Sequence, residues 1–161
     1  KPLAFVESAD HGELQSVDVP NVTHNKEDQM LRAFHMAQKA LFDFKGKPSP
    51  NRKLYISGQD PAQAEMIWGA LMILADELKF EPQAVRVVIP GFEPRMSKRV
   101  WGAKPVIKDE LKEVLKEDFL SEMIALSKEV QQYKEQDLSD KAFEAIEKSV
   151  KKMKEDLQPP Q

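Results

Sequence analysis

The sequence predicts an α/β or α+β fold, in which a small mixed sheet is joined to a C-terminal antiparallel helical hairpin. Residues 53–90 read as strand, turn, helix and strand in one continuous stretch, which is the pattern of a parallel βαβ unit. Residues 3–19 read as an N-terminal β-hairpin, and the residues after Pro105 carry two apolar stripes at helical spacing. We therefore expect an α/β domain over residues 1–104 and a helical hairpin, packed on it, over residues 105–161.

Composition narrows the class of protein without naming an activity. A length of 161 residues fits one domain with a helical appendage. The hydrophobic fraction of 41% is enough for a core, so the charged fraction of 32% indicates solvated helix faces and not disorder. The absence of cysteine excludes a disulfide framework, a thiol nucleophile and a thiolate metal site. A net charge of −3 argues against a general nucleic-acid binder.

The ends of the sequence and its longest apolar runs bear on location. The chain opens on Lys1 without a basic and then apolar leader, and it contains no apolar run of about 18 residues. We therefore expect no membrane insertion. The expectation is an excised piece of a larger soluble protein, cytoplasmic in the cell that makes it, with translocation into a recipient or host cell left open.

The N-terminal third should hold the hairpin and a first helix. The runs LAFV and ELQSVDV favour strands, and Gly12 in the turn between them can adopt positive φ without a Cβ clash. Asn25 is expected to cap the helix, and Asp28 places negative charge in its first turn. The residues of its apolar face are Met30, Leu31, Phe34, Ala37, Leu41 and Phe44. The proline-containing run KGKPSPNR should end it.

The central helix and the strand after it are both strongly apolar. Asp60 is expected to cap the helix, and Pro61 suits the first helical position because its missing N–H is not needed there. The run AVRVVI predicts a central parallel strand that is covered on both faces. Arg86 interrupts that run, so we expect it near an edge or paired with an acid.

The C-terminal tail carries two stripes of heptad type. Their residues are Phe119, Met123, Leu126, Val130 and Tyr133 in the first, and Phe143, Ile146, Val150, Met153 and Leu157 in the second. With a break at residues 136–139 and Ser139 as a cap, the simplest arrangement is two antiparallel helices packed along these stripes. In the alternative arrangement, one stripe covers the sheet and the other remains free for a partner helix.

The turn after the first βαβ strand is one candidate site. It consists of Ser57, Gly58, Gln59 and Asp60, and it precedes a helix N-terminus, where free N–H groups can hold an anion. Asp60 is itself an anion in that place, and no phosphate-binding glycine motif is present. These observations favour a structural turn.

The segment 91–104 is the second candidate site. It clusters basic residues around an indole, namely Arg95, Lys98, Arg99, Lys104 and Trp101. Guanidinium groups suit carboxylate or phosphate recognition, and an indole offers a stacking surface or an apolar anchor. Three interpretations stay open: the segment pairs with the acidic C-terminal helices, binds a protein, or binds a nucleotide or nucleic acid.

No residue pattern predicts catalysis, a metal or a cofactor. His11, His24 and His35 form no pair at the i, i+4 spacing of a helical metal site. No serine lies in a G-x-S-x-G elbow. We therefore expect no catalytic residues in this fragment.

A resemblance to a known family adds to this reading. It covers roughly residues 3–90 and is carried by Ala33, Ala37, Ser57, Gly58, Leu74 and Ala75. In these residues the chain resembles the accessory α/β domain found in large polyvalent proteins of phages, conjugative relaxases and other type IV secretion substrates or effectors. The resemblance implies an auxiliary module and supplies no catalytic residues.

The function expected from these observations is recognition, by docking to a protein partner or to secretion machinery. Arg95, Lys98, Arg99 and Trp101 are the expected contacts, since charge combined with an aromatic anchor is typical of interfaces. The alternative is a nucleotide-binding or nucleotide-processing domain that uses the turn at residues 57–60 beneath the basic segment. Binding of single-stranded nucleic acid is a third possibility, and it should weaken with added salt.

Overall fold

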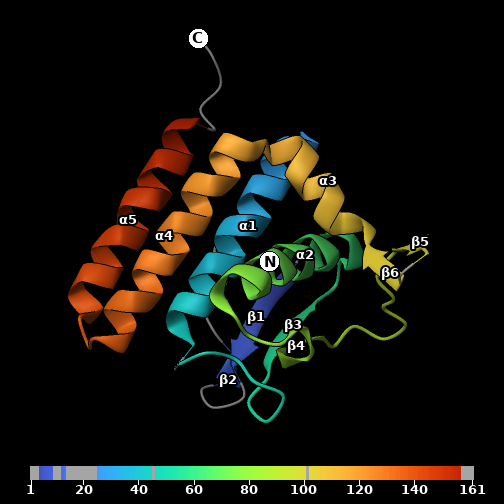
Figure 1. Cartoon of the computed structure of the whole chain (residues 1–161), viewed down its shortest axis with the longest axis horizontal. Helices are drawn as coiled ribbons and strands as arrows, with labels where there is room; N and C mark the ends of the chain where they lie inside the picture. Colours follow the sequence, from blue (N-terminus) through green and yellow to red (C-terminus); the bar gives the residue numbers. More distant parts are fainter. Residues whose placement is uncertain (1–3, 9–11, 14–24, 45, 101, 157–161) are drawn as a thin grey trace.

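A computed structural model describes residues 4–8, 12–13, 25–44, 46–100 and 102–156 (Figure 1). Four strands form one sheet in the order β2-β1-β3-β4. They are β1 (Ala4–Ser8), β2 (Gly12–Glu13), β3 (Leu54–Gly58) and β4 (Val85–Val87). β1 is antiparallel to β2 and β3, whereas β3 and β4 are parallel. The predicted mixed sheet and βαβ unit are confirmed, and so is the antiparallel pairing of the first two strands. Gly12, which was expected in the turn, lies in β2, and residues 14–19 of the expected second strand fall outside the described residues.

Helices make up most of the rest of the described chain. They are α1 (Lys26–Asp43), α2 (Pro61–Leu78), the short 3₁₀ helix η1 (Pro82–Ala84), α3 (Val106–Leu115), α4 (Glu117–Glu135) and α5 (Ser139–Asp156). In Figure 1, α1 and α2 lie over the sheet, α3 crosses the end of α2, and α4 and α5 stand side by side next to α1. The fold is therefore mixed α and β, with its helices collected on one side.

The starts of α1 and α2 follow the predicted capping chemistry. Asn25 Oδ1 accepts a hydrogen bond of 2.8 Å from the backbone N–H of Glu27. Asp60 Oδ1 accepts one of 3.0 Å from the N–H of Ala62, and Pro61 occupies the first helical position. Each cap satisfies a donor that the helix itself leaves free. Both predicted helix starts are confirmed.

A lysine from the tail closes the end of α1. The last turn of α1 holds no basic residue of its own. Lys134 Nζ, from α4, donates to the carbonyl of Leu41 at 2.7 Å and to the carbonyl of Phe44. Burial lowers the pKa of Lys134 to about 8. Lys134 thus supplies donors to carbonyls that have no partner inside the helix, and it ties α4 to the far end of α1.

The expectation of a central, doubly covered strand at residues 84–89 is wrong. β4 has three residues and lies at the edge of the sheet. Arg86 is exposed and Val88 is 43% exposed, whereas Val85 and its neighbour on β3, Leu54, are buried. The helices cover one face of this pair of strands, so alternate residues of an almost fully apolar run face solvent. The edge position expected for Arg86 is confirmed.

The tail contains the predicted pair of antiparallel helices, α4 and α5, and also a helix that was not predicted, α3. α5 begins at Ser139 itself, so Ser139 is the first helical residue and not the residue before it. The α4 stripe divides between two environments. Met123 belongs to the main core with α1 and α2, and Phe119 packs against it, whereas Val130 lies in a second cluster with residues of α5. The antiparallel pair packed along its stripes is the arrangement observed, and α4 also packs against α1 and α2. The side chains of Val150, Met153 and Leu157 lie outside what the structure describes.

The main hydrophobic core continues across residue 104. Buried side chains of α3 and α4 join those of α1, β3 and α2 in one cluster. The tail members of this cluster are Ile107, Leu111, Leu115, Leu120 and Met123. Gln38 adds a buried polar link, because its Nε2 donates to Met123 O at 3.1 Å and to Ser127 Oγ at 2.9 Å. The division into domains at residue 104 stays a prediction, with the two parts sharing one core.

Close packing between α2 and α3 depends on a glycine. A Cβ placed on Gly69 would lie 2.6 Å from Ile107 Cγ2 and 2.9 Å from Ile107 Cγ1. Ile107 is 1% exposed, and both of these atoms are held close to its backbone by the branched side chain. A side chain at residue 69 would therefore push the two helices apart.

Candidate functional site

The basic segment at residues 91–104 contains a second, two-stranded sheet. β5 (Met96–Arg99) and β6 (Gly102–Pro105) pair antiparallel, with Lys98 opposite Ala103. We call residues 96–105 the hairpin arm. In Figure 1 the arm lies at the edge of the molecule beyond the start of α3. A loop was expected at these positions, and two paired strands lie there instead.

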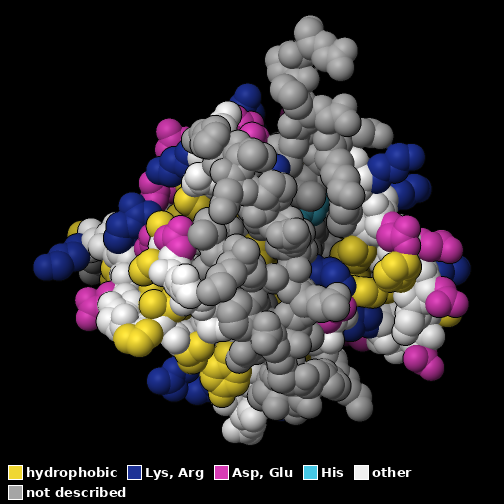
Figure 2. All heavy atoms as spheres, turned by 180° about the vertical axis from the view of Figure 1, so that it is seen from behind, with side chains coloured by type: hydrophobic (Ala, Val, Ile, Leu, Met, Phe, Trp, Pro, Cys, Tyr) yellow, Lys and Arg dark blue, Asp and Glu magenta, His cyan; other side chains and the backbone are white. Residues whose placement is uncertain are grey.

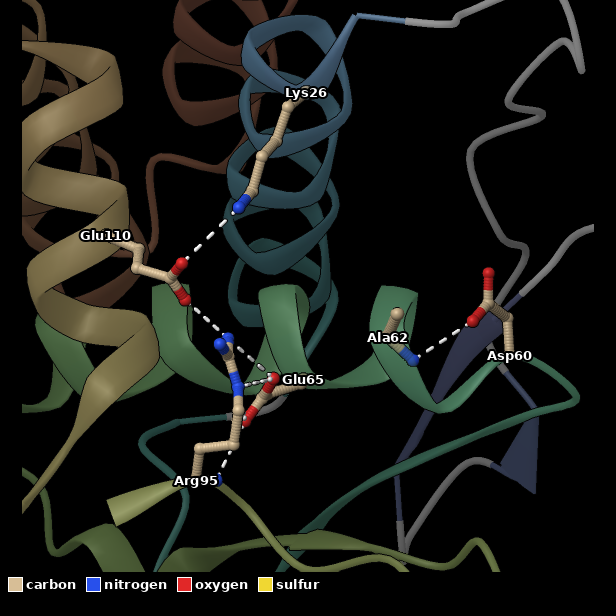
Figure 3. A network of polar contacts seen from close by, with 6 residues as sticks. All are labelled: Lys26, Asp60, Ala62, Glu65, Arg95 and Glu110. Atoms are coloured by element: carbon tan, nitrogen blue, oxygen red, sulfur yellow. Dashed lines mark hydrogen bonds and ion pairs between the residues drawn. The ribbon is translucent and has the colours of Figure 1, made fainter. Parts of the chain in front are cut away.

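The base of the arm is fixed by Arg95. Its backbone N–H donates to Glu65 Oε2 at 2.9 Å, and its Nε donates to Glu65 Oε1 at 3.1 Å. The other end of the guanidinium pairs with Glu110 on α3, and Glu110 also pairs with Lys26 Nζ at 3.3 Å (Figure 3). Glu65 is only 9% exposed. Arg95 therefore joins the arm to α2 and α3 through carboxylates within the chain.

The charges of this network stabilise one another. Hydrogen bonds to Glu65 and Glu110 raise the pKa of Arg95. Burial opposes ionisation of Glu110, but the hydrogen bonds from Arg95 and Lys26 outweigh it and lower the pKa of Glu110. Arg95 therefore pairs with an acidic residue of the C-terminal helices, Glu110, as the first of the three interpretations of the basic segment expected.

Replacing Glu65 by glutamine should loosen the arm and lower stability. The substitution removes the charge that accepts two donors of Arg95, so we expect a loss of about 1–2 kcal/mol in the free energy of unfolding. Glu77→Gln is the matched control, because Glu77 lies on the same helix in an exposed ion pair with Lys128. That change should cost less than about 1 kcal/mol. Urea unfolding measures both variants, and equal losses would contradict the anchoring role of Glu65.

The other basic residues of the segment differ from Arg95. Lys98 and Lys104 are exposed and make no ion pair with another described residue. Trp101 and the side chain of Arg99 lie outside what the structure describes. Two hydrophobic side chains of the arm are also exposed, with Met96 at 46% and Val100 at 94%. Sequence reasoning did not include Met96 or Val100 in the site.

Basic and hydrophobic side chains therefore share the projecting arm. The left edge of Figure 2 shows basic and hydrophobic side chains close together, with acidic side chains beside them. This surface offers charge and apolar area together, which is the composition needed for contact with another macromolecule.

The first candidate turn has a structural role. Gly58 has φ 148°, a value that side chains disfavour, and it ends β3. Asp60 fills the N-terminus of α2 with its own carboxylate. Ser57 is half-buried and Gln59 is exposed, and among the described residues Ser57 Oγ has no hydrogen-bond partner. These features match the structural turn favoured by the sequence.

The structure brings both candidate segments to the first turns of α2. Asp60 caps that helix, and Arg95 binds Glu65 five residues further along (Figure 3). No hydrogen bond or ion pair joins residues 57–60 to the arm within the described chain. The two segments are neighbours of one helix, and their side chains do not form one polar cluster.

A groove is lined by residues of α4 and α5 and by His35 of α1. It has a volume of about 1080 Å³, and its lining includes His35, Phe119, Glu122, Leu126, Lys148 and Lys152. His35 Nδ1 lies 3.5 Å from Ser149 Oγ, and burial lowers the pKa of His35 to about 4. Among the described residues, no three acidic or histidine side chains are placed to hold a metal ion. His11 and His24 fall outside the described residues.

No family model, curated protein or solved structure matches this chain. Across the described helices, none combines the length and the apolar character required to cross a membrane.

Proposed function

We propose that this chain is a non-catalytic recognition module that docks a protein partner through the hairpin arm. The observation that carries the proposal is the concentration of exposed apolar side chains there. Five large hydrophobic side chains are exposed among the described residues, and two of them, Met96 and Val100, lie in the ten-residue arm. Single exposed apolar residues are ordinary, but two of them beside exposed lysines on one short hairpin are typical of a binding surface.

The fixed base of the arm supports this role. Arg95 holds the start of β5 through Glu65 and Glu110, so the arm is presented in one place before a partner arrives. A preorganised contact loses less conformational entropy on binding. Arg95 thus acts as a positioning residue for the arm.

The side chains of the arm indicate the chemistry of the partner. Lys98 and Lys104 favour an acidic surface and would increase the association rate. Val100 and Met96 would add affinity by burying apolar area. The partner that fits is a protein segment in which acidic residues flank apolar ones.

The proposal includes a setting for this interaction. If the resemblance to accessory domains of large polyvalent proteins holds, the partner is secretion machinery or another module of such a bacterial protein. The chain would then be cytoplasmic in the producing cell before any transfer. These parts of the proposal rest on the resemblance alone.

The docking role can be tested with a peptide-display library selected on the whole chain. Selected peptides should be acidic and apolar, and their binding should weaken about tenfold or more in Lys98→Glu/Val100→Ser, since loss of a central contact costs more than about 1.4 kcal/mol. Fluorescence anisotropy with the soluble peptides measures this change.

The matched control makes the same two changes elsewhere. Lys112→Glu/Leu138→Ser alters an exposed lysine and an exposed leucine outside the arm, and it should leave affinity within about twofold. Both variants should keep the melting curve of the parent chain by circular dichroism. Selected peptides that bind the arm variant and the parent equally would refute docking through the arm.

A further inference from the structure

The hydrogen-bond pattern of the arm determines which backbone groups face outward. The N–H of Val106 donates to the carbonyl of Arg95 at 2.9 Å, which makes these two residues a hydrogen-bonded pair. Hydrogen-bonded and non-hydrogen-bonded pairs alternate along an antiparallel ladder. The next hydrogen-bonded pair is therefore Ser97 with Lys104, in agreement with the observed register. The residues of the alternate pairs, Met96 with Pro105 and Lys98 with Ala103, direct their free backbone groups away from the partner strand.

The two outer edges of the arm differ in their donors. On β6 the outward groups belong to Ala103 and Pro105, and proline has no N–H to offer. On β5 they belong to Met96 and Lys98, and each keeps both an N–H and a C=O. Within the described residues, no hydrogen bond occupies these groups of β5. The edge of β5 is therefore the one able to pair with a further strand.

We propose that the outer edge of β5 binds an extended acidic peptide segment by β-strand addition. This inference rests on the proposed docking function and names the kind of partner. Met96 and Lys98 supply alternating donors and acceptors to the backbone of the incoming strand. Their side chains fall on the same face of the arm, so acidic and apolar side chains of the peptide meet Lys98 and Met96.

Charge disfavours the β5 edge of a second copy as the added strand. Antiparallel pairing of two β5 edges would place Lys98 of one copy directly or diagonally opposite Lys98 of the other. Like charges on paired strands are destabilising, and lysine on an edge strand opposes self-association. An acidic strand would instead place a carboxylate opposite Lys98, and this interaction is attractive.

Amide hydrogen exchange tests the proposal without any substitution. The probe is a terminally blocked Glu-Val-Glu-Val-Glu-Val peptide, with Lys-Val-Lys-Val-Lys-Val as the charge control. Saturating acidic peptide should slow exchange of the Met96 and Lys98 amides about tenfold or more and leave the Ala103 amide unchanged. The basic peptide should change none of them.

Two proline variants separate the backbone from the side chain. Lys98→Pro removes an outward N–H and keeps the internal ladder, and Lys98→Ala removes only the side chain. We expect Lys98→Pro to bind the acidic peptide about fivefold more weakly than Lys98→Ala does, because the proline variant loses one hydrogen bond to the peptide. Ala103→Pro, the matched change on the other edge, should bind like the parent. Slow exchange of the Ser97 and Lys104 amides verifies that the arm is folded in each variant.

The outcomes distinguish this inference from the docking role itself. If the acidic peptide binds but Met96 and Lys98 exchange as fast as before, or if Lys98→Pro and Lys98→Ala bind equally, strand addition is wrong and docking by side chains stands. If peptides selected from the library bind and the acidic peptide does not, the proposed peptide class is wrong. If neither binds, both the inference and the docking function are refuted.

Discussion

Gly69→Val is expected to lower the free energy of unfolding by about 3 kcal/mol, because the new side chain would overpack the contact between α2 and α3. The Cβ position alone is 2.6 Å from Ile107 Cγ2, well inside van der Waals contact. Ile107 is buried, so it has little room to move aside. Urea unfolding of the purified chain measures the loss.

Two further variants show whether crowding causes this loss. Ala62→Val introduces the same residue at an exposed position of α2 and should cost less than about 1 kcal/mol, the difference in helix propensity. Ile107→Ala removes both clashing atoms, so in its presence Gly69→Val should be at least about 1 kcal/mol less harmful. Additive losses in the double variant would show that steric conflict with Ile107 is not the reason.

Acid should destabilise the chain through His35. Burial lowers its pKa to about 4 in the folded chain, from the ordinary value of 6.5. Between these two values the unfolded chain binds more protons than the folded chain does, so stability falls as the pH falls through this window. Above pH 6.5 the imidazole is neutral in both the folded and the unfolded chain, so its burial has no protonation cost there. From pH 7 to pH 4.5 we expect a loss of about 2.5 kcal/mol from this residue.

The surroundings of His35 explain why protonation is costly. The side chain is buried, and Ser149 Oγ on α5 lies 3.5 Å from its Nδ1. The charged side chains that line the same groove come from α4 and α5, and they are Glu122, Glu129, Lys141, Glu144, Glu147, Lys148, Lys151 and Lys152. Glu122 and Lys152 pair with each other near the surface, so Glu122 is already engaged by a lysine.

The pH effect can be isolated by comparing two chains. The glutamine in the His35→Gln variant cannot bind a proton. The carboxylates contribute equally to the pH dependence of stability in the variant and in the parent. The difference between their unfolding free energies should therefore change by about 2.5 kcal/mol between pH 7 and pH 4.5. Direct titration of the imidazole by NMR gives the pKa independently. Parallel stability curves, or an imidazole that titrates near 6.5, would contradict this account.

Local chemistry made much of the fold predictable. Asn25, Asp60 and Pro61 define helix starts by the donors they satisfy or lack, and these rules need no knowledge of the rest of the chain. The parallel pairing of β3 and β4 followed from a strand, helix and strand of suitable lengths. By contrast, the edge position of β4 depends on strand order, which an apolar run does not encode. The run of residues 84–89 looked central because Val88 is apolar, yet Val88 faces outward.

The site was harder to predict because its important contacts are distant in sequence. Arg95 was expected to face a partner, but Glu65 and Glu110 lie 30 and 15 residues away and meet it only in the folded chain. A signal for the missed hairpin was present. Gly102, which has φ 130°, pairs with Arg99, so only two residues of sequence separate the two short strands. Such spacing is typical of tight hairpins, even without the usual Asn-Gly pair.

The shared core has a practical consequence for anyone who wishes to shorten this polypeptide. Ending the chain after residue 104 would remove the five tail side chains that belong to the main core. The apolar side chains of α1 and α2 that they cover would then be exposed to solvent. It would also free the last carbonyls of α1 from the ammonium group of Lys134. Chains truncated at this point should aggregate during purification. Any fragment prepared for binding assays should therefore include α3, α4 and α5.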